Sequence, residues 1–600
     1  MKLSDYVISF IAAKGVKQVF LLTGGGAMHL NDSLGASKSV RYVCCLHEQA
    51  CAIAAEAYAK YDNRLGVVMV TVGPGATNTI TGVCGAWLDS TPMLFLSGQV
   101  KRADLKGKSG VRNRGVQEID IVSLVKPVTK YAVLVDDPNS IRYHLEKAVH
   151  LAFHKRPGPV WLDIPLDVQA SSINPLRQKG YEIKRQYSQA EDRSLAKKVK
   201  KTVKLLNQAE RPFLLFGNGI RISGATKEFL RTIKKLGIPF GLTWPAMDLV
   251  PDGHPLLVGR PGPIAPRGVN FALQNSDFLL MVGTRMDLVL TAFSPERLAR
   301  SAKKVMVDID KNEIAKIGHI IDVPVCADAR RFLKKLLSQS GIKKNKKLDL
   351  WRERCKKWRK KYPILLAEHR LRKKPISMFY FTEILSKALA PGDLIVPGSS
   401  GNAIETLLLA FKTKTNQRIF ITTGLGPMGF GLPASIGACL AHKGRRTVCV
   451  DGDGGFQMNI QELETLARLK LPVKIFVINN GGYGSIVASQ KAYFGRLTGA
   501  DASSGVTLPA VTKIAQAYGL STFSIGSQEN LFSKIERILK HPGPVVCNVK
   551  VVPDEPRNPR VSSMQRPDGT MVSRPLEDMY PFLDRKEFLE NMIIQPVKEE

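Results

Sequence analysis

The sequence VDGDGGFQMNIQELETLARLKLPVKIFVINNGGYGSI, residues 450–486, decides the fold of this chain. It begins at the end of an apolar strand, passes through a turn rich in Gly and Asp, and continues as a helical pattern over 458–469. A second apolar strand over 473–478 leads into Asn480. Because doubly wound parallel sheets bind ligands at the carboxyl ends of their strands, we expect Asp453 and Asn480 on one edge of such a sheet.

Three oxygen groups in this stretch suit a hard divalent cation. Mg²⁺ takes oxygen ligands in a tight octahedron, usually one or two protein groups completed by phosphate oxygens and water. Asp453 supplies a carboxylate, Asn480 an amide oxygen 27 residues later, and Gly482 a backbone carbonyl. The turn also lets the backbone approach a diphosphate at a helix N-terminus, because it contains Gly452, Gly454 and Gly455. A GDG turn alone is most often structural, but this spacing predicts a site for Mg²⁺ and a diphosphate.

Length and composition indicate a multidomain α/β protein. The 600 residues exceed what one hydrophobic core supports, and 44% apolar residues, 23% charged residues and 50 glycines are typical of a globular chain with many turns. No apolar run reaches the roughly 18 residues of a membrane span. The start of the chain fits an amphipathic helix better than a signal peptide, and nine scattered cysteines fit reduced thiols. We therefore expect a cytoplasmic protein with no membrane partner.

Alternating strands and helices divide the chain into three α/β domains. The strands lack the polar alternation of a half-exposed sheet, which is typical of doubly wound parallel sheets covered on both faces. Seven of the last 50 residues are Pro, so we expect a tail that lies across the protein, anchored by Met579, Tyr580, Phe582 and Leu583. The expected order is a first domain over 1–180, a middle domain over 190–340, a basic helical linker over 341–375, a third domain over 376–550 and a Pro-rich C-terminal tail over 551–600.

About a third of the net charge of +35 lies in the linker. Residues 341–375 hold 15 Lys or Arg and three acidic residues, which is +12 of the total. A solvated helix with one buried stripe explains this composition, and the stripe would contain Leu348, Trp351, Cys355 and Trp358. Attraction of nucleic acid or another polyanion is the alternative, but the chain lacks a recognisable nucleic-acid-binding motif.

Five motifs, in order, resemble the acetolactate synthase (acetohydroxyacid synthase) large-subunit family of thiamine diphosphate (ThDP) enzymes. The GDG turn followed by the double Asn resembles the family's signature for ThDP and Mg²⁺. The similarity runs over about residues 1–550 and is carried by LHEQACAIAAEAYAK, VTVGPGATNTITGV, RPGPVWLDIPLDV, TTGLGPMGFGLPASIGA and VDGDGGFQMNIQELETLARLKLPVKIFVINN. It implies pyrimidine-binding (Pyr), middle and diphosphate-binding (PP) domains, in a homodimer or dimer of dimers with active sites at the interface.

The resemblance assigns roles to residues of both ThDP domains. Glu48 would contact the aminopyrimidine N1′ and start proton transfer, although a glutamate at a helix start is otherwise a common structural feature. Met428 takes the place of the bulky residue under the bent cofactor, or is an ordinary core residue, and Gln117 matches the family's active-site Gln. Each site would combine Glu48 of one chain with Asp453 and Asn480 of another. The remaining implied cofactor positions are Gly25, Gly398, Ser399, Ser400, Gly401, Gly426 and Tyr483.

Three positions depart from the acetolactate-forming members, all on the acceptor side of the implied pocket. Val116 and Ser489 stand where those members carry Phe and Trp, and Leu166 where they carry Lys. Smaller side chains would admit a larger acceptor. Without the lysine cation, the pocket would bind a carboxylate acceptor less well. We therefore expect pyruvate or a similar 2-oxo acid as donor and a larger carbonyl acceptor. A nucleotide-linked ketosugar is one such acceptor, because the tail MQRPDGTMVSRPLEDMYPFLDR resembles proteins associated with bacterial surface sugars. His29 would donate a proton to the acceptor, or is an ordinary loop histidine.

Other functions stay open at this point. True acetolactate synthase, joining two pyruvates, and simple decarboxylation or C–C lysis would use the same residues. A non-catalytic ThDP-fold scaffold would not need Glu48, Asp453 and Asn480 together. FAD is also open, since biosynthetic members of the family carry it in the middle domain and others do not. The glycine loop at 217–219 and Arg285 match the family's pattern only in part.

Overall fold

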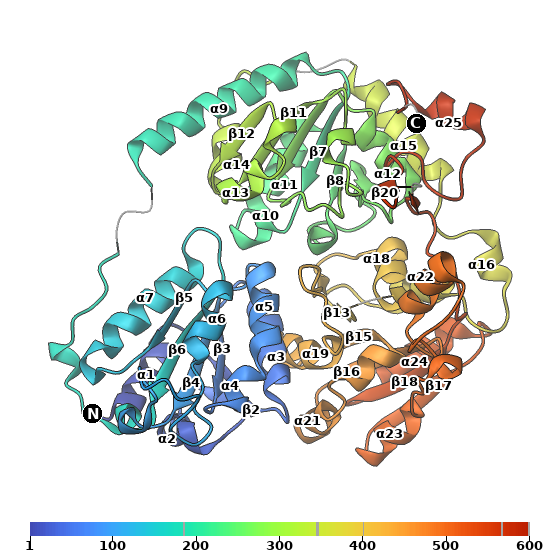
Figure 1. Ribbon diagram of the computed structural model, residues 1–600. Coiled ribbons are helices and arrows are strands. Elements are labelled where there is room, and N and C mark those ends of the chain that lie inside the picture. The colour runs from blue at the N-terminus through green and yellow to red at the C-terminus, as the bar shows by residue number, and fades with distance from the viewer. Residues whose placement is uncertain (184–186, 344–346, 400, 566–567, 598–600) are drawn as a thin grey trace. The chain divides into compact units, whose positions relative to one another are not determined.

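The computed structural model describes residues 1–183, 187–343, 347–399, 401–565 and 568–597 (Figure 1). The chain forms two compact units, each assembled from separated segments. The first unit consists of Met1–Lys184, Asp393–Ile404 and Arg418–Pro553, and the second of Arg185–Gly392, Glu405–Gln417 and Asp554–Glu600. Within the described residues, three six-stranded parallel sheets carry the fold, two in the first unit and one in the second. The predicted α/β class with three doubly wound sheets is therefore confirmed.

The first sheet has the strand order β2-β1-β3-β4-β6-β5, with every pair parallel. The chain runs from β1 outward to β2 and then returns past β1 to β3, so the order reverses between β1 and β3. Ligands of doubly wound sheets bind at such a switch point, beyond the carboxyl ends of the strands. The strands are β1 (Gln18–Leu21), β2 (Arg41–Cys44), β3 (Gly66–Val70), β4 (Met93–Gln99), β5 (Tyr131–Leu134) and β6 (Pro159–Pro165).

Helices cover both faces of this sheet (Figure 1). Alternate residues of one strand enter different cores: in β3, Met69 packs with α1 and α7, whereas Val68 packs with α3 and α5. All residues of β3, β4 and β6 are buried, which explains why they lack polar alternation. The helices are α1 (Leu3–Ala13), α2 (Met28–Gly35), α3 (Glu48–Lys60), α4 (Pro74–Thr77), α5 (Ile80–Leu88), α6 (Ile121–Val125), α7 (Ile141–Phe153) and α8 (Leu166–Ala170).

The other sheet of the first unit repeats this strand order, as β14-β13-β15-β16-β18-β17. Its switch point lies between β13 and β15, and the last residue of β15, Gly452, pairs with Ile478 of β16. Asp453 and Asn480 therefore leave the sheet at the same edge. The strands are β13 (Leu394–Pro397), β14 (Arg418–Ile419), β15 (Thr447–Gly452), β16 (Val473–Asn479), β17 (Ser521–Ile525) and β18 (Val545–Lys550), and the helices are α19 (Gly431–Ala441), α20 (Asp453–Gln457), α21 (Glu462–Leu469), α22 (Gly484–Phe494), α23 (Val511–Ala517) and α24 (Leu531–Lys540).

Helices α3 and α19 pack closely against each other and so join the two sheets of the first unit. A Cβ atom on Gly437 would lie 1.9 Å from the carbonyl oxygen of Ala54, a distance that no side chain can adopt. On the neighbouring α5, a Cβ on Gly82 would lie 2.3 Å from Cβ of Ala52. The run of small residues in α3 is thus required by the close approach of two helices.

The second unit contains the middle sheet, with the strand order β12-β11-β10-β7-β8-β9. Its core is rich in aromatic residues, with Phe229 edge-on to Phe216 at a ring-centroid distance of 4.8 Å. The strands are β7 (Pro212–Phe216), β8 (Phe240–Leu242), β9 (Leu257–Gly259), β10 (Phe278–Val282), β11 (Lys303–Asp308) and β12 (Val323–Cys326), and the main helices are α9 (Gln189–Gln208), α11 (Thr226–Leu236), α12 (Arg267–Gln274) and α14 (Ala329–Leu337).

The basic linker forms α15 (Leu348–Lys361), and its predicted buried stripe of Leu348, Trp351, Cys355 and Trp358 is confirmed. Its arginines serve the fold of the second unit. Arg352 Nε donates to the Gly237 carbonyl (2.6 Å), and an Arg354 nitrogen donates to the Glu590 carbonyl (2.9 Å). Much of the linker's charge therefore belongs to intramolecular hydrogen bonds.

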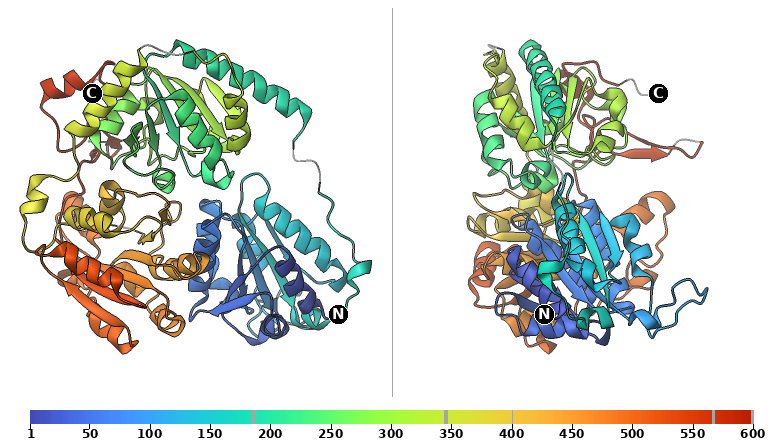
Figure 2. Two further views of the ribbon diagram at one scale, coloured as in Figure 1. Left: turned by 180° about the vertical axis from the view of Figure 1, so that it is seen from behind. Right: turned by 90° about the vertical axis from the view of Figure 1, so that its left-hand side faces the viewer.

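The Pro-rich tail folds onto the second unit and ends in α25 (Arg585–Asn591). Met579 is 1% exposed and Leu583 packs on the core, as predicted for anchors. Tyr580 and Phe582 remain 46% and 43% exposed, so their prediction as anchors was wrong. Earlier in the tail, β19 (Ser563–Gln565) and β20 (Met571–Ser573) form an antiparallel hairpin that projects in the right-hand view of Figure 2.

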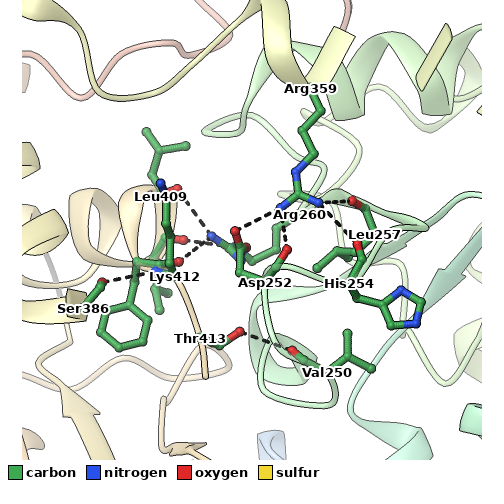
Figure 3. A network of polar contacts seen from close by, with 12 residues as sticks. Val250, Asp252, His254, Leu257, Arg260, Arg359, Ser386, Leu409, Lys412 and Thr413 are labelled. Carbon is green, nitrogen blue, oxygen red and sulfur yellow. Dashed lines mark hydrogen bonds and ion pairs between the residues drawn. The ribbon is translucent and has the colours of Figure 1, made fainter. Parts of the chain in front are cut away.

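A buried arginine explains why residues 405–417 belong to the second unit (Figure 3). Arg260 is 4% exposed and pairs with Asp252 at 3.1 Å. It also donates to the carbonyls of Leu408 (3.1 Å) and Phe411 (2.9 Å), at the end of α18 (Glu405–Ala410). These carbonyls lack partners further along their helix, so the guanidinium satisfies them and fixes the segment.

Six of the nine cysteines are buried, as expected from their scatter in the sequence. Within the described ranges, no helix combines the length and the apolar character needed to cross a bilayer.

Candidate active site

Asp453 is the first residue of α20, and its carboxylate is held by backbone amides at the edge of the sheet. Oδ1 accepts from Gly454 N–H (2.9 Å), and Oδ2 accepts from Gly481 N–H (2.8 Å). The side chain is 3% exposed, and burial raises the pKa of Asp453 to about 6 against the opposing effect of these amides. A nearby cation would stabilise the ionised form of such a carboxylate.

The side-chain amide of Asn480 completes a cluster with Asp453 and Gly482. One terminal atom of the amide lies 3.0 Å from Asp453 Oδ1 and 2.9 Å from the Gly482 carbonyl oxygen. With the amide nitrogen in that place, it would donate to both oxygens. With the oxygen there, it lies from each of the other two oxygens at the spacing of neighbouring ligands in an octahedron of 2.0–2.1 Å bonds, which is about 2.9 Å.

This donor set fits Mg²⁺. One carboxylate, one amide oxygen and one backbone carbonyl are hard oxygen ligands, and they leave room for phosphate oxygens and water. In the part of the chain that the structure describes, no group of three or more His, Cys, Asp and Glu side chains could hold a metal ion. A metal at this edge would therefore depend on the Asp453 cluster.

The backbone around this cluster is shaped for a close ligand. A Cβ on Gly454 would lie 2.5 Å from the ring of Tyr483 and 3.5 Å from the methyl group of Met428. The structure thus brings Met428 and Tyr483 to the start of α20. Gly426 and Gly429 adopt positive φ angles of 65° and 85°, and Asn459 Nδ2 donates to the Gly429 carbonyl (2.9 Å), which fixes the loop that carries Met428.

Asp451 is a buried carboxylate beside the Asp453 cluster that the sequence analysis did not single out. Its buried carboxylate fills the space left by three glycines from separate segments, because a Cβ on Gly398, Gly431 or Gly455 would lie 2.1, 2.4 or 2.7 Å from its oxygens. Burial raises the pKa of Asp451 to about 7. The repeated Asp-Gly pair in VDGDGG was the only available signal, and it did not distinguish the two carboxylates.

The segment after β13 reaches the same edge. Gly398 N–H donates to the Val450 carbonyl (2.7 Å), and Ser399 follows, half-buried. Gly401 has a φ of 65° and lies near Ser485 Oγ, which would be 3.5 Å from its Cβ. Ser400 lies outside the described residues.

Glu48 stands at the corresponding edge of the first sheet. It is the first residue of α3, 8% exposed, and Oε2 accepts from Asn78 Nδ2 (3.0 Å). Oε1 would lie 3.6 Å from a Cβ on Gly75, in the glycine–proline turn after β3. His47 caps the helix by accepting from Gln49 N–H (3.1 Å). Asn78 was not foreseen as a partner, although it lies in the quoted motif VTVGPGATN.

Gly25 and Gln117 lie at the same edge, on either side of the switch point. Gly25 begins the 3₁₀ turn η1 (Gly25–Ala27), where Gly26 N–H donates to Thr71 Oγ1 (3.0 Å). Gln117 has a φ of 62°, and its carbonyl oxygen would lie 2.4 Å from a Cβ on Gly73. His29 follows in the first turn of α2, half-buried.

The structure does not bring Glu48 into contact with Asp453 or Asn480. Among the described residues, the Glu48 side chain bonds to Asn78, and one link between the two edges is Leu46 N–H donating to Glu462 Oε1 (2.8 Å). This separation agrees with the expectation that the two halves of one site come from different chains, which stays a prediction.

Comparisons with known proteins cover nearly the whole chain. Residues 1–124 match the N-terminal TPP binding domain of thiamine pyrophosphate enzymes, residues 199–336 their central domain, and residues 400–549 their C-terminal TPP binding domain. The probable acetolactate synthase large subunit of Methanocaldococcus jannaschii is 32% identical over 573 residues, which is 92% of this chain and 93% of that protein. The chain belongs to the acetolactate synthase large-subunit family of ThDP enzymes.

Members of this acetolactate synthase family from other lineages are equally similar. The Porphyra purpurea large subunit is 30% identical over 565 residues, covering 93% of both chains. The chloroplastic acetolactate synthase 2 of Nicotiana tabacum is 32% identical over 573 residues, covering 93% of this chain and 83% of that protein. The recognition made from the motifs is confirmed, and this protein is a ThDP-dependent, acetolactate-synthase-like enzyme.

The middle domain of this family member has a packed glycine loop. A Cβ on Gly217 would lie 2.1 Å from the Gly283 carbonyl, and one on Gly219 would lie 2.6 Å from Gly283 Cα. These glycines therefore allow the loops after β7 and β10 to approach each other. Neither this packing nor the comparisons test FAD, which stays a prediction.

Proposed function

We propose that this enzyme is a ThDP- and Mg²⁺-dependent carboligase that decarboxylates pyruvate and transfers the acyl group to a carbonyl compound larger than pyruvate. In this reaction the bond between the carboxylate and carbonyl carbons breaks and CO₂ leaves. A new C–C bond then forms to the acceptor's carbonyl carbon, and the acceptor oxygen takes a proton. A nucleotide-linked ketosugar is the acceptor class that we favour.

The observation that carries this proposal is the small size of the acceptor-side residues. Val116 is 84% exposed beside Gln117, and Ser489 is exposed on α22, the helix after Tyr483. Leu166 directly follows β6 at the Glu48 edge and supplies no cation for a second carboxylate. Both features favour an acceptor with more bulk than pyruvate.

The edges of the two sheets in the first unit would have different roles toward the cofactor. Asp453, Asn480 and the Gly482 carbonyl would hold Mg²⁺, and the glycine amides around them would hold the diphosphate. ThDP, when bound, supplies a nucleophilic carbon and an electron sink for decarboxylation. Glu48 would exchange a proton with the aminopyrimidine, and Met428 would support the bent cofactor from below.

Two further side chains would act on the substrates. Gln117 would orient them by hydrogen bonding from the turn at Gly73. His29 would give the acceptor oxygen its proton.

Purified protein with ThDP, Mg²⁺ and pyruvate tests the proposal. We expect CO₂ release to depend on adding a bulky carbonyl acceptor, with the ligated product found by mass spectrometry. Acetolactate without any added acceptor would reveal a true acetolactate synthase. CO₂ without a ligated product would reveal a decarboxylase or lyase, and no CO₂ from any 2-oxo acid would favour a non-catalytic scaffold.

True acetolactate synthase is the second candidate. The coverage of more than nine tenths of the M. jannaschii and P. purpurea proteins, which carry that name, favours it. The identity of 30–32% does not fix the acceptor.

The remaining proposals concern organisation. We propose a cytoplasmic homodimer or dimer of dimers with domain limits of 1–180, 190–340, 341–375, 376–550 and 551–600. The strands of each sheet fall within one of these ranges, which supports the limits. Sedimentation would test the oligomer, and an absorption spectrum near the flavin bands would test FAD.

A further inference from the structure

The loop between β4 and α6 is strongly basic. Residues 101–117, which we call the basic loop, contain one acidic residue, Asp104, and six cations: Lys101, Arg102, Lys106, Lys108, Arg112 and Arg114. The right-hand view of Figure 2 shows a blue loop of this region projecting from its sheet. None of the roles proposed above for the decarboxylation of a 2-oxo acid uses the charge of this loop.

The base of the loop is fixed by two ion pairs. Lys101 pairs with Asp104 at 3.3 Å, and Arg102 Nε pairs with Asp167 at 2.7 Å. Asp167 also accepts from Arg102 N–H (3.0 Å), so the base is tied to α8, next to Leu166. Two of the six cations are therefore used in holding the loop.

Glu118 closes the far end of the loop. This side chain is 7% exposed and accepts backbone N–H groups of Lys106 (2.6 Å), Arg114 (2.7 Å) and Gly115 (3.2 Å). Burial alone would raise the pKa of Glu118, but these three donors outweigh it and the pKa lies below its ordinary value. An ionised carboxylate thus holds the loop in shape from inside.

Three cations at the tip have no side-chain partner among the residues that the structure describes. Lys108, Arg112 and Arg114 are exposed, and in the described ranges none of their side chains forms an ion pair or donates a hydrogen bond. The contrast with α15 is clear, since Arg352 and Arg354 there donate to carbonyls of the second unit. A loop that is held in shape and carries three unpaired cations within seven residues suits a ligand with several negative charges.

The loop leads directly to the Glu48 edge. It ends on Gln117, which packs on Gly73, and Gly75 of the same turn lies beside the Glu48 carboxylate. The exposed Val116 lies between the cations and this turn. A substrate whose carbonyl reaches the Glu48 edge can therefore extend its other end along the basic loop.

We propose that the basic loop binds the phosphate groups of the acceptor, so that the acceptor is a phosphorylated or diphosphate-linked carbonyl compound. This inference rests on the proposed carboligase function. Phosphate groups match the loop because guanidinium groups bind their oxygens in pairs and an ammonium group binds them as a point charge. One carboxylate, as in pyruvate, would use a single cation and leave the others unpaired.

The test compares two variants that lose the same charge. The first is Lys108→Gln, Arg112→Gln and Arg114→Gln together. The control is Lys197→Gln, Lys200→Gln and Lys204→Gln together, on the exposed face of α9 in the second unit. Each is loaded with ThDP and Mg²⁺ and titrated calorimetrically with UDP at several salt concentrations.

We expect UDP to bind the unchanged enzyme and the control alike, and the loop variant about tenfold to a hundredfold more weakly. The salt dependence of UDP binding should flatten in the loop variant because fewer charges are engaged. Equal binding of UDP to the loop variant, or no binding to the unchanged enzyme, would overturn the proposal. A single-stranded oligonucleotide that binds the loop more tightly than UDP would overturn it in favour of nucleic acid.

Turnover measurements distinguish failure of the phosphate site from failure of the proposed carboligase function. With pyruvate as donor, dihydroxyacetone and dihydroxyacetone phosphate serve as a matched acceptor pair. The ratio of their kcat/KM values should favour the phosphate in the unchanged enzyme and should fall about tenfold or more in the loop variant. If pyruvate releases no CO₂ under any condition, the proposed function fails. If CO₂ is released and both UDP binding and this ratio resist the loop substitutions, the function stands and the phosphate site alone is rejected.

Discussion

The two sheets of the first unit have the same topology and different chemistry. Both follow the strand order 2-1-3-4-6-5 when their strands are numbered from the first in each, and both have a switch point between their first and third strands. At that edge the β1–β6 sheet presents Glu48, Gln117 and the cations of the basic loop. The β13–β18 sheet presents the Asp453 oxygen cluster and glycine amides. Topology thus fixes where a site is built, and the residues after each strand decide what it binds.

The largest effect should come from removing the carboxylate of the oxygen cluster, which is found at the edge of the β13–β18 sheet and not at that of the β1–β6 sheet. We expect Asp453→Ala to abolish Mg²⁺-dependent ThDP uptake, with affinity lower by about a hundredfold or more, because the cluster loses its only negative charge. Calorimetric titration measures this. Undiminished uptake, in a variant whose unfolding midpoint is unchanged, would contradict the assignment of the oxygen cluster.

Glu48→Gln should separate binding from chemistry at the other edge. Gln keeps the shape and a hydrogen bond to Asn78 but cannot exchange a proton, so we expect turnover to fall by about 10²–10⁴ while ThDP affinity changes little. Turnover of pyruvate and ThDP titration are measured on the same preparation. Activity equal to that of the unchanged enzyme would reject the role of Glu48.

Gly437→Ala tests the contact that joins the two sheets. Its Cβ would meet the Ala54 carbonyl at 1.9 Å, so α3 and α19 must separate, at a cost of about 1–3 kcal/mol. The midpoint of urea unfolding should fall accordingly. Gly35→Ala is the control, because a Cβ there meets nothing within 4 Å. Equal midpoints for both variants would show that the helices are not in close contact.

The smallest expected effect concerns a position in the sixth strand where one sheet has Asp and the other has Asn. Asp163 of β6 pairs with Ser97, the fifth residue of β4, and Asn548 of β18 pairs with Val477, the fifth residue of β16. Burial raises the pKa of Asp163 from 3.8 to about 7, against the hydrogen bonds from Ser97 and Gln99. In the folded chain this carboxyl keeps its proton to about pH 7, whereas the unfolded chain loses it near pH 3.8.

Unfolding therefore releases a proton between these pH values, and the stability that Asp163 contributes falls as pH rises through this window. Asp163→Asn should remove that slope, so the variant should gain about 1 kcal/mol or more relative to the unchanged protein between pH 5 and pH 8. Urea unfolding at both pH values measures the difference. A difference that does not change with pH would mean that the carboxyl is ionised in the folded chain.

The parts of the site that sequence could predict are those formed within one strand–turn–helix unit. Asp453, Asn480 and Gly482 lie at the ends of adjacent strands, so their spacing already implies a shared edge. The buried stripe of α15 was likewise visible, because helical periodicity is local.

The parts that sequence missed depend on contacts between distant segments. Asp451 fills a space between Gly398, Gly431 and Gly455, and that space exists only after three segments have met. The attachment of residues 405–417 to the second unit depends on Arg260, which lies about 150 residues earlier in the chain. Tyr580 and Phe582 show a related limit, because apolar character alone does not say which side of a segment turns inward.

The interleaving of the two units has a consequence for biosynthesis. The middle sheet is complete once Cys326 has left the ribosome, but its unit still lacks the α18 segment and the tail over 554–600. The first unit, which began earlier, closes at Pro553. A nascent chain must therefore carry a middle domain without these two segments through some 270 further residues of translation, and stalling in that interval would leave the domain prone to aggregation.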